Sequence, residues 1–353
     1  MSESKPNFFE RTRAARKVLV PDLGFLGDTV HLLPALWMVR QAYPQAELHL
    51  MVAQHVMSLM DCLPWVDCVW GYSRFPEHAS LAENLQVVRR LRKARFDVAI
   101  NLNGSDRSSW LTWLSGANER LGRLPVDGGP LFWRSLFTEV VENPFFEEPA
   151  YLQKWHCLRK AGFPGKQAEF HLEFAAKDLQ STGLNLADAR TFFHISPFTK
   201  TDEKELPLNT TANLIDALQD QFPLKRLAIS CAPDIAERQK MQALLAKLKR
   251  KPWRVLPGSL TFTQLAGLIQ QSALHLSGDT GTLHLALMAG VPTVSWFRTA
   301  EGMKAWIPAG AKHRTLLGTG AGCEGLKGLA VADVLEAVKA LMGQEKSGTP
   351  GAP

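Results

Sequence analysis

The sequence predicts an α/β fold made of two successive doubly wound units. The chain has 353 residues, whereas a single hydrophobic core stops growing at roughly 250–300 residues, so two domains are expected. Short apolar segments alternate with amphipathic segments in both halves of the chain, as they do where helices connect parallel strands. A polar connection that runs to about residue 190 separates the halves, and the alternation begins again after it.

In the first half, short apolar runs are predicted strands and the amphipathic segments between them are predicted helices. The predicted strands are Lys17 to Val20, Glu47 to Val52, Val66 to Trp70 and Phe96 to Leu102. The predicted helices are Leu32 to Ala42, Leu81 to Lys93, Ser108 to Ser115 and Tyr151 to Ala161. Residues 124 to 150 are rich in Pro and Gly, which predicts irregular structure.

The same rhythm continues in the second half. The predicted strands are Thr191 to Ser196, Arg226 to Ser230, Arg254 to Leu256, Ala273 to Leu276 and Thr293 to Phe297. The predicted helices are Leu208 to Gln221, Ile235 to Lys247, Phe262 to Gln270, Leu283 to Ala289 and Val331 to Met342. We therefore expect one domain over residues 1–170, a second over 171–342, and a disordered tail rich in Gly, Pro and Ser over 343–353.

Composition favours a soluble enzyme of a reducing compartment. Apolar residues make up 46% of the chain and charged residues 21%, which is ordinary for a globular protein. No apolar run approaches the roughly 20 residues of a membrane span, and the first residues lack the apolar core of a secretory signal. The five cysteines are irregularly spaced, which argues against a disulfide framework. A cytoplasmic location is expected.

The formal net charge is +6, and the basic residues gather in two places. These are Arg11, Arg13, Arg16 and Lys17 before the first predicted strand, and Arg89, Arg90, Arg92, Lys93 and Arg95 at one helix end. Such groups can bind nucleic acid, anionic lipid or phosphorylated sugars. A solvated surface is the simpler interpretation, and no nucleic-acid-binding signature accompanies the charge, so we expect no nucleic-acid partner.

The most informative stretch follows the apolar run Ala273 to Leu276. Ser277-Gly-Asp-Thr-Gly281 has the pattern of a turn between a strand and a helix. At the carboxyl edge of a parallel sheet, such a turn directs the free N–H groups of the helix start toward a bound anion. The loops after Val20, Ser196 and Leu276 should all meet at carboxyl edges, where ligands of doubly wound folds bind.

Three motifs together resemble the bacterial glycosyltransferase family nine, the lipopolysaccharide heptosyltransferases. The first is the opening strand and glycine turn of residues 18–36, which contain Gly24, Gly27-Asp28 and Leu33-Pro-Ala-Leu36. The second is the loop His194 to Pro207, in which the family carries a lysine followed by Trp-Pro. The third is the 277–297 segment. They occur in the family's order and span about 280 residues, which is more specific than one glycine turn.

The resemblance implies a GT-B fold, in which two doubly wound Rossmann-like domains face each other across a cleft. The N-terminal domain would bind the acceptor and the C-terminal domain the nucleotide-sugar donor. It further implies an inverting enzyme that moves heptose from ADP-heptose to the lipopolysaccharide inner core or a lipid A precursor, without a cofactor. Such an acceptor is compatible with peripheral contact at the cytoplasmic face of the inner membrane.

Two residues are the catalytic candidates that the resemblance supplies. Asp28 matches the family's aspartate and would be the base that accepts the acceptor proton. Its alternative role is to cap the following helix. Lys204 matches the family's lysine and would stabilise the departing diphosphate. The alternative is a solvated lysine in a charged loop.

Further positions follow from the same motifs. Donor binding is expected from Thr199, Lys204, Asp279, Thr280, Gly281 and His284, of which Asp279 and Thr280 could also cap a helix and His284 could simply pack in the core. Acceptor binding is expected from Asn103, Arg107, Arg120 and Arg123, with the Pro- and Gly-rich residues 124–150 bordering the acceptor groove. An arginine can grip a phosphate or carboxylate with paired hydrogen bonds, but a surface arginine without a ligand is an equal alternative.

The chain departs from the family pattern around the donor pocket, where Leu206 replaces a tryptophan, Gly278 precedes Asp279 and Arg298 follows the last strand of the motif. These changes leave open a donor other than ADP-heptose more than another fold or reaction class. A separate hypothesis is a protein of the same fold that binds a sugar nucleotide or lipopolysaccharide without catalysis. No zinc-ligand spacing or Asp-x-Asp metal clamp occurs, so a metal-independent transferase is expected.

Overall fold

The computed structural model describes residues 6–73, 81–124, 131–143, 148–170, 188–258, 260–307, 312–318 and 326–345. The chain divides into two compact units, Met1–Glu173 and Phe174–Pro353. The expected boundary between residues 170 and 171 adjoins residues 171–187, which lie outside the described residues, as does most of the expected tail. The domain limits drawn from the sequence therefore stay a prediction.

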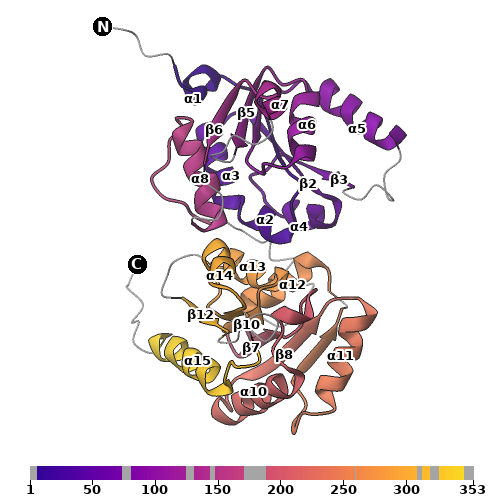
Figure 1. The fold of residues 1–353 in the computed structure, drawn as a ribbon, viewed down its shortest axis with the longest axis vertical. Coiled ribbons are helices and arrows are strands. Elements are labelled where there is room, and N and C mark those ends of the chain that lie inside the picture. Colours follow the sequence, from indigo (N-terminus) through magenta and orange to yellow (C-terminus); the bar gives the residue numbers. More distant parts are fainter. Residues whose placement is uncertain are drawn as a thin grey trace. The chain divides into compact units, whose positions relative to one another are not determined.

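A six-stranded parallel sheet forms the centre of the N-terminal unit (Figure 1). Its strands are β1 Lys17–Asp22, β2 Glu47–Ala53, β3 Cys68–Tyr72, β4 Val98–Asn101, β5 Glu119–Leu124 and β6 Glu139–Glu142. Their order in the sheet is β3-β2-β1-β4-β5-β6, so the direction of winding reverses beside β1, between β1 and β4. In this topology ligands bind at the carboxyl ends of the strands next to the reversal.

The C-terminal unit repeats this topology. Its strands are β7 Phe192–Ser196, β8 Arg226–Cys231, β9 Arg254–Pro257, β10 Leu274–Gly278, β11 Thr293–Phe297 and β12 His313–Leu317. The order β12-β11-β10-β7-β8-β9 places the reversal between β7 and β10. The predicted fold class, α/β with two doubly wound Rossmann-like units, is confirmed.

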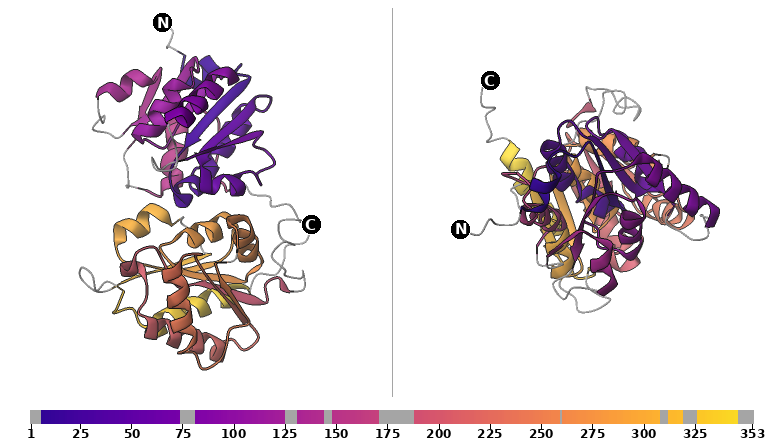
Figure 2. Two further views of the ribbon diagram at one scale, coloured as in Figure 1. Left: turned by 90° about the vertical axis from the view of Figure 1, so that its right-hand side faces the viewer. Right: turned by 90° about the horizontal axis from the view of Figure 1, so that it is seen from above.

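Helices cover both faces of each sheet (Figure 2). The N-terminal unit contains α1 Phe8–Thr12, α2 Leu26–Val30, α3 Leu33–Ala42, α4 Met57–Met60, α5 Leu81–Ala94, α6 Asp106–Leu114, α7 Leu131–Leu136 and α8 Ala150–Lys160, with a 3₁₀ turn at Gln54–Val56. α3 packs against α8, while α5, α6 and α7 lie side by side. Because crossovers between parallel strands are right-handed, these two groups cover opposite faces.

The helices of the C-terminal unit are α10 Leu208–Gln221, α11 Ile235–Leu245, α12 Phe262–Gln271, α13 Gly281–Met288, α14 Ala300–Trp306 and α15 Val331–Glu345. A 3₁₀ turn, η4 Asp202–Lys204, precedes α10. The unit's main core gathers residues from β7, β8, β10, α10 and α15. In the described part of the chain, no helix is long and apolar enough to cross a membrane.

One sequence interpretation is wrong in part. Residues 124–150 were expected to be irregular, yet they contain α7 and β6. β6 is four residues long and has a glutamate at each end, so its strand pattern is too short to outweigh the surrounding Pro and Gly signals. The expected acceptor groove falls partly on residues 125–130 and 144–147, which lie outside the described residues. The strands β5 and β12 and the helices α1, α2, α4 and α14 were also missed.

Two buried histidines lie opposite each other on neighbouring strands of the C-terminal sheet. His194 on β7 and His275 on β10 stack with ring centroids 5.0 Å apart, and their Nδ1 atoms are 2.9 Å apart. Nε2 of His194 contacts Ser230 at 3.0 Å, and Nε2 of His275 contacts Ser277 at 3.0 Å. One Nδ1 must donate and the other accept, so the accepting ring is neutral, and burial disfavours a charge on either ring. Burial lowers the pKa of His194 to about 3 and lowers that of His275 well below its ordinary value.

We expect these histidines to make the protein less stable as pH falls below about 6.5. Below this pH the two histidines bind protons in the unfolded chain, whereas their buried rings in the native protein do not. Each ring therefore lowers the free energy of unfolding by up to about 1.4 kcal/mol per pH unit. His194→Asn should reduce this slope by about that amount between pH 6 and 4, as measured by urea unfolding. His156→Gln is the control, because its side chain is 43% exposed. Equal slopes in wild type and His194→Asn would contradict the assignment.

Candidate functional site

The reversal point of the N-terminal sheet carries Asp28 on a tight turn after β1. Asp28 is half-buried at the third position of α2, and its Oδ2 accepts a hydrogen bond from the backbone N–H of Phe25 (2.9 Å). A Cβ at Gly24 would lie 2.3 Å from the Cβ of Asp28, so the turn requires glycine there. The carboxylate thus stabilises the start of α2, and the role of Asp28 as a base stays a prediction.

A buried ion pair that the sequence did not reveal lies beneath this turn. Asp22, with none of its surface exposed, contacts Nζ of Lys154 on α8 at 2.7 Å. The same ammonium donates to the backbone carbonyl of Asp28 (2.6 Å). Oδ1 of Asp22 accepts from the N–H of Gly24 (3.0 Å) and from Nδ2 of Asn103 (3.1 Å). Asp22 and Lys154 therefore connect the turn that carries Asp28 to the loop after β4.

The four expected acceptor residues do not gather in one place. Asn103 lies at the reversal point through its bond to Asp22, and Arg107 is exposed in the first turn of α6. Arg120 lies near the beginning of β5, at the opposite edge of the sheet. Its guanidinium donates to the backbone carbonyls of Leu136 (2.8 Å) and Ala117 (2.6 Å), so it joins the end of α7 to β5.

Arg123 is close to the carboxyl end of β5 but points into the unit. It is 4% exposed, and Nη2 donates to Oε1 of Gln153 on α8 at 2.5 Å. Burial lowers the pKa of this guanidinium to about 10, so it keeps its charge at neutral pH. Arg123 thus supports α8, next to Lys154, and does not present its charge to solvent.

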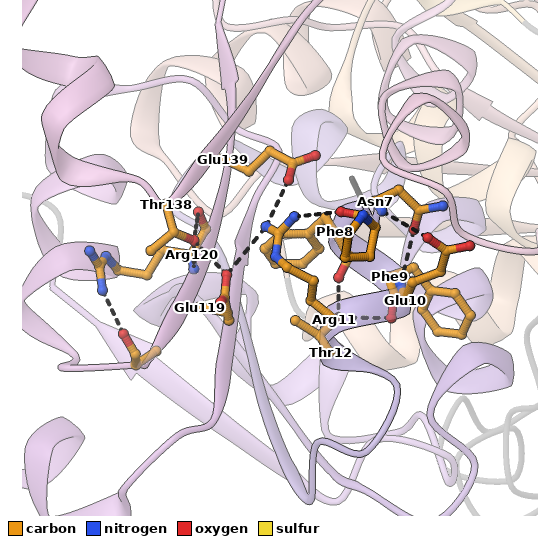
Figure 3. Close-up of polar contacts among 12 residues, drawn as sticks. Asn7, Phe8, Phe9, Glu10, Arg11, Thr12, Glu119, Arg120, Thr138 and Glu139 are labelled. Atoms are coloured by element: carbon orange, nitrogen blue, oxygen red, sulfur yellow. Dashed lines mark hydrogen bonds and ion pairs between the residues drawn. The ribbon is translucent and has the colours of Figure 1, made fainter. Parts of the chain in front are cut away.

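Two residues of the front basic group, Arg11 and Lys17, are held in ion pairs at the edge of the sheet where the strands begin. Arg11 on α1 contacts Glu139 at 2.8 Å and Glu119 at 3.5 Å, and Figure 3 shows its guanidinium between the two carboxylates. Lys17 contacts Glu47 at 2.8 Å. These pairs favour a structural role for the front basic group over binding of an external anion.

In the C-terminal unit, the structure brings Lys204 and Asp279 together at the reversal point. Nζ of Lys204, at the end of η4, lies 2.5 Å from Oδ2 of Asp279 after β10. The lysine side chain is 43% exposed and that of Asp279 is 14% exposed. The pair is accessible from the carboxyl edge of the sheet, where a ligand of this fold is expected.

The start of α13 adjoins this ion pair. Thr280 occupies the N-cap position with an extended backbone, and its side chain makes no capping hydrogen bond in the described structure. Asp279 precedes the cap and contacts Lys204 instead, so the capping alternative does not describe its main contact. Gly281 begins the helix. The first N–H groups of α13 therefore point toward the edge where Lys204 lies, as in helix-terminal anion sites.

Thr199 and His284 have other partners. The N–H of Thr199 donates to Oε1 of Glu205 (2.8 Å), and its hydroxyl donates to the carbonyl of Thr201 (2.6 Å). Thr199 thus shapes the Lys204 loop from within. His284 is 6% exposed and meets the ring of Trp306 edge to face at 5.1 Å. Burial lowers its pKa to about 4, so it adds no positive charge at neutral pH.

Trp296 on β11 and the loop that carries Lys204 both pack close to Gly278. Leu206, at the position where tryptophan was expected, is 4% exposed in the core. Trp296 on β11 is 1% exposed. A Cβ at Gly278 would lie 2.9 Å from Nε1 of Trp296 and 2.6 Å from the carbonyl oxygen of Lys204. Glycine at 278 therefore lets the lysine loop and the indole pack against the end of β10, which explains this departure in physical terms.

No group of three or more His, Cys, Asp or Glu side chains suited to a metal ion occurs among the described residues. Each unit thus carries one polar cluster at the carboxyl edge of its sheet. The N-terminal cluster contains Asp28, Asp22 and Lys154, and the C-terminal cluster contains Lys204, Asp279 and the start of α13. The first offers a carboxylate beside a polar loop, and the second offers a cation and helix amides for an anion.

Comparisons with known proteins agree with this architecture. The family model described as Glycosyltransferase family 9 (heptosyltransferase) matches residues 84–323. Among curated proteins, the lipopolysaccharide core heptosyltransferase OpsX of Haemophilus influenzae is 22% identical over 290 residues, which cover 81% of this chain and 80% of that protein.

Solved structures show the same fold at low identity. A glycosyl transferase of family 9 from Veillonella parvula superposes with a TM-score of 0.82 at 18% identity, over 93% of this chain and 98% of that one. The Escherichia coli heptosyltransferase WaaC with ADP-2-deoxy-2-fluoro heptose has a TM-score of 0.72 at 19% identity, over 91% of this chain and 99% of that one.

Proposed function

The chain belongs to glycosyltransferase family 9, and we propose that it transfers heptose from ADP-heptose to the inner core of lipopolysaccharide with inversion at the anomeric carbon. Membership of the family makes the protein a glycosyltransferase. The curated relative is named for heptose transfer to lipopolysaccharide core, and one similar structure was solved with an ADP-heptose analogue. These names supply the donor and acceptor of the proposal.

One observation carries the proposal furthest: Lys204 and Asp279 meet at the start of α13. A nucleoside diphosphate leaving group needs positive potential, and an ammonium together with helix amides supplies it without a metal ion. Asp279 lies 2.5 Å from Nζ of Lys204. When the diphosphate binds Lys204, the Asp279 carboxylate remains beside it as an acceptor for donor hydroxyls.

Asp28 provides the second half of the reaction. Its carboxylate accepts the proton of the acceptor hydroxyl while that oxygen attacks the anomeric carbon and the bond to ADP breaks. The hydrogen bond from Phe25 to Oδ2 and the glycine at 24 fix the carboxylate on its turn, and a fixed base avoids reorganisation during the reaction. Asn103 and Arg107 lie on the loop and helix start that follow β4, where the acceptor would bind.

The lipid part of the proposed acceptor indicates where in the cell the enzyme works. Lipopolysaccharide precursors carry lipid A, so an enzyme that glycosylates their core works beside a membrane. We infer a cytoplasmic enzyme that meets its acceptor at the cytoplasmic face of the inner membrane. Its donor is a nucleotide sugar, and no nucleic acid takes part.

ADP should stabilise the protein against heat without a divalent metal, and Lys204→Ala should weaken ADP binding by roughly 10- to 100-fold. The magnitude follows from losing a charge-assisted hydrogen bond worth about 1.5–3 kcal/mol. The substitution also leaves the Asp279 carboxylate facing the diphosphate without the lysine between them. The measurement is the melting temperature against ADP concentration in EDTA, which converts to affinity through linkage.

Lys200→Ala is the matched control, since Lys200 is an exposed lysine of the same loop and should leave ADP affinity unchanged. Parallel titrations with UDP, GDP and CMP test the second candidate, a transferase with another donor. Selective stabilisation by UDP, or a strict need for magnesium, would overturn the ADP assignment. The third candidate, a binding protein without catalysis, predicts ADP binding with no transfer, and the presence of Asp28, Lys204 and Asp279 argues against it.

A further inference from the structure

Three exposed aromatic side chains form a continuous cluster on the outer surface of α6 and α7. Trp110, Trp113 and Phe132 are 43%, 41% and 47% exposed. The Trp110 ring stacks on Phe132 with centroids 6.0 Å apart and meets Trp113 edge to face at 5.9 Å. Single exposed apolar side chains are ordinary on a protein surface, but a contiguous group marks a surface that contacts an apolar partner.

The backbone beneath these rings is held in place. Trp133 is 9% exposed, and its Nε1 donates a hydrogen bond to Oδ1 of Asp106 at the start of α6 (2.7 Å). This bond ties α7 to α6 and leaves Phe132, its neighbour in the sequence, on the outer side. Trp110 and Trp113 are three residues apart on α6, so they share one helical face.

A row of cations on α5 borders the aromatic cluster. Nε of Arg92 donates to the backbone carbonyl of Leu114, next to Trp113 (3.2 Å), and Arg89 and Lys93 are exposed on the same helix. Figure 1 shows α5, α6 and α7 along one face of the N-terminal unit. Residues 81–95, 106–114 and 131–136 together hold seven Lys or Arg and two Asp or Glu, whereas the whole chain has a net charge of +6.

We propose that this aromatic-cationic face, formed by Trp110, Trp113, Phe132 and the α5 cations Arg89, Arg92 and Lys93, docks on the surface of an anionic lipid bilayer. Tryptophan and phenylalanine partition into the headgroup region, while nearby Lys and Arg are attracted by negative lipids. The two contributions act at the same depth, because the rings and the cations lie on neighbouring helices of one face.

Other occupants fit less well. A second copy of the chain would bring the same cations against each other, and like charges across an interface disfavour association. Single-stranded nucleic acid binds along basic grooves in which successive bases stack on aromatic rings, whereas Trp110, Trp113 and Phe132 pack on one another as one apolar cluster. The proposal does not depend on the donor, on Asp28 or on Lys204.

The test is flotation of the purified full-length protein with vesicles of phosphatidylcholine, with and without phosphatidylglycerol. Wild type should bind the anionic vesicles in a salt-dependent manner. Arg89→Gln with Lys93→Gln should reduce the partition coefficient by roughly 10-fold or more, at about fivefold per cation. Trp110→Ser with Trp113→Ser should also reduce it, and should reduce the quenching of tryptophan fluorescence by brominated lipid.

Leu224→Ser with Ile235→Ser is the matched control, because these side chains are 91% and 76% exposed in the C-terminal unit and should not affect flotation. Melting temperatures establish that each variant folds, and ADP affinity should be unchanged in all of them. Failure of wild type to bind anionic vesicles would overturn the proposal. Binding as strong as that of wild type by both the Arg89→Gln, Lys93→Gln and the Trp110→Ser, Trp113→Ser variants would also overturn it. Self-association that Trp110→Ser with Trp113→Ser abolishes, without vesicle binding, would assign the face to a second copy instead.

Discussion

Replacing Asp28 with asparagine should lower sugar transfer by roughly 100-fold or more while the protein stays folded and binds ADP normally. Asparagine is nearly isosteric, and its side-chain oxygen can still accept the hydrogen bond from the Phe25 N–H that Oδ2 accepts now at 2.9 Å. It cannot accept a proton from the acceptor hydroxyl at neutral pH. The substitution thus separates the base from the structural role that the carboxylate also has.

The measurement is the rate of heptose transfer to truncated core acceptor by purified proteins, with melting temperature and ADP affinity recorded alongside. Asp97→Asn is the control, because Oδ2 of Asp97 accepts from the backbone N–H groups of Arg16 (2.8 Å) and Lys17 (3.0 Å) at the other edge of the sheet. It should keep nearly full activity. Near-normal transfer by a well-folded Asp28→Asn protein would remove Asp28 as the base.

The sequence predicted the fold because both sheets follow simple local rules. Strands buried on both faces appear as apolar runs, and the connecting helices have apolar stripes. Ten of these segments therefore reappear with both ends within one residue of the expected limits. Thr293–Phe297 and Leu208–Gln221 match in full. The strand β6 was missed because its four residues, Glu139–Glu142, carry charge at both ends, and only pairing with β5 makes them a strand.

The candidate site residues were predictable where a polar or charged residue lies in a short motif directly after a strand. Lys204 and Asp279 each stood out in a loop after a strand, and the parallel topology of β7 and β10 brings those loops together. Arg120 and Arg123 show the limit of that reasoning, because a strand alternates its side chains and the sequence does not say which basic residue reaches solvent. Arg120 instead binds backbone carbonyls, and Arg123 is buried.

The pairing of Asp22 with Lys154 could not be predicted, since 132 residues separate them and each alone has an ordinary interpretation. An aspartate after an apolar strand suggests a turn, and a lysine in an amphipathic helix suggests a solvated side chain. Packing of α8 against α3 buries the lysine below the end of β1. A buried charge needs a partner, and Asp22 supplies one.

Lys154→Met should therefore destabilise the N-terminal unit by about 3–5 kcal/mol, because it leaves the buried Asp22 carboxylate without its counter-ion. Thermal unfolding of a unit of this size should shift down by roughly 10 °C. Transfer should fall as well, since the ammonium also holds the backbone carbonyl of Asp28 at 2.6 Å. We expect kcat to drop more than KM changes, because the base loses its position while the donor loop in the other unit is untouched.

The variant Asp22→Asn with Lys154→Met distinguishes the cost of an unpaired Asp22 carboxylate from the loss of the ammonium's hydrogen bond to the Asp28 carbonyl. Asparagine keeps an acceptor for the N–H of Gly24 (3.0 Å) without an ionised group, so the double variant should recover most of the lost stability. Lys160→Met is the surface control on α8, an exposed lysine whose loss should cost less than about 1 kcal/mol. A double variant no more stable than Lys154→Met would show that the hydrogen bond from the ammonium to the Asp28 carbonyl (2.6 Å), and not the neutralisation of Asp22, stabilises the turn that carries Asp28.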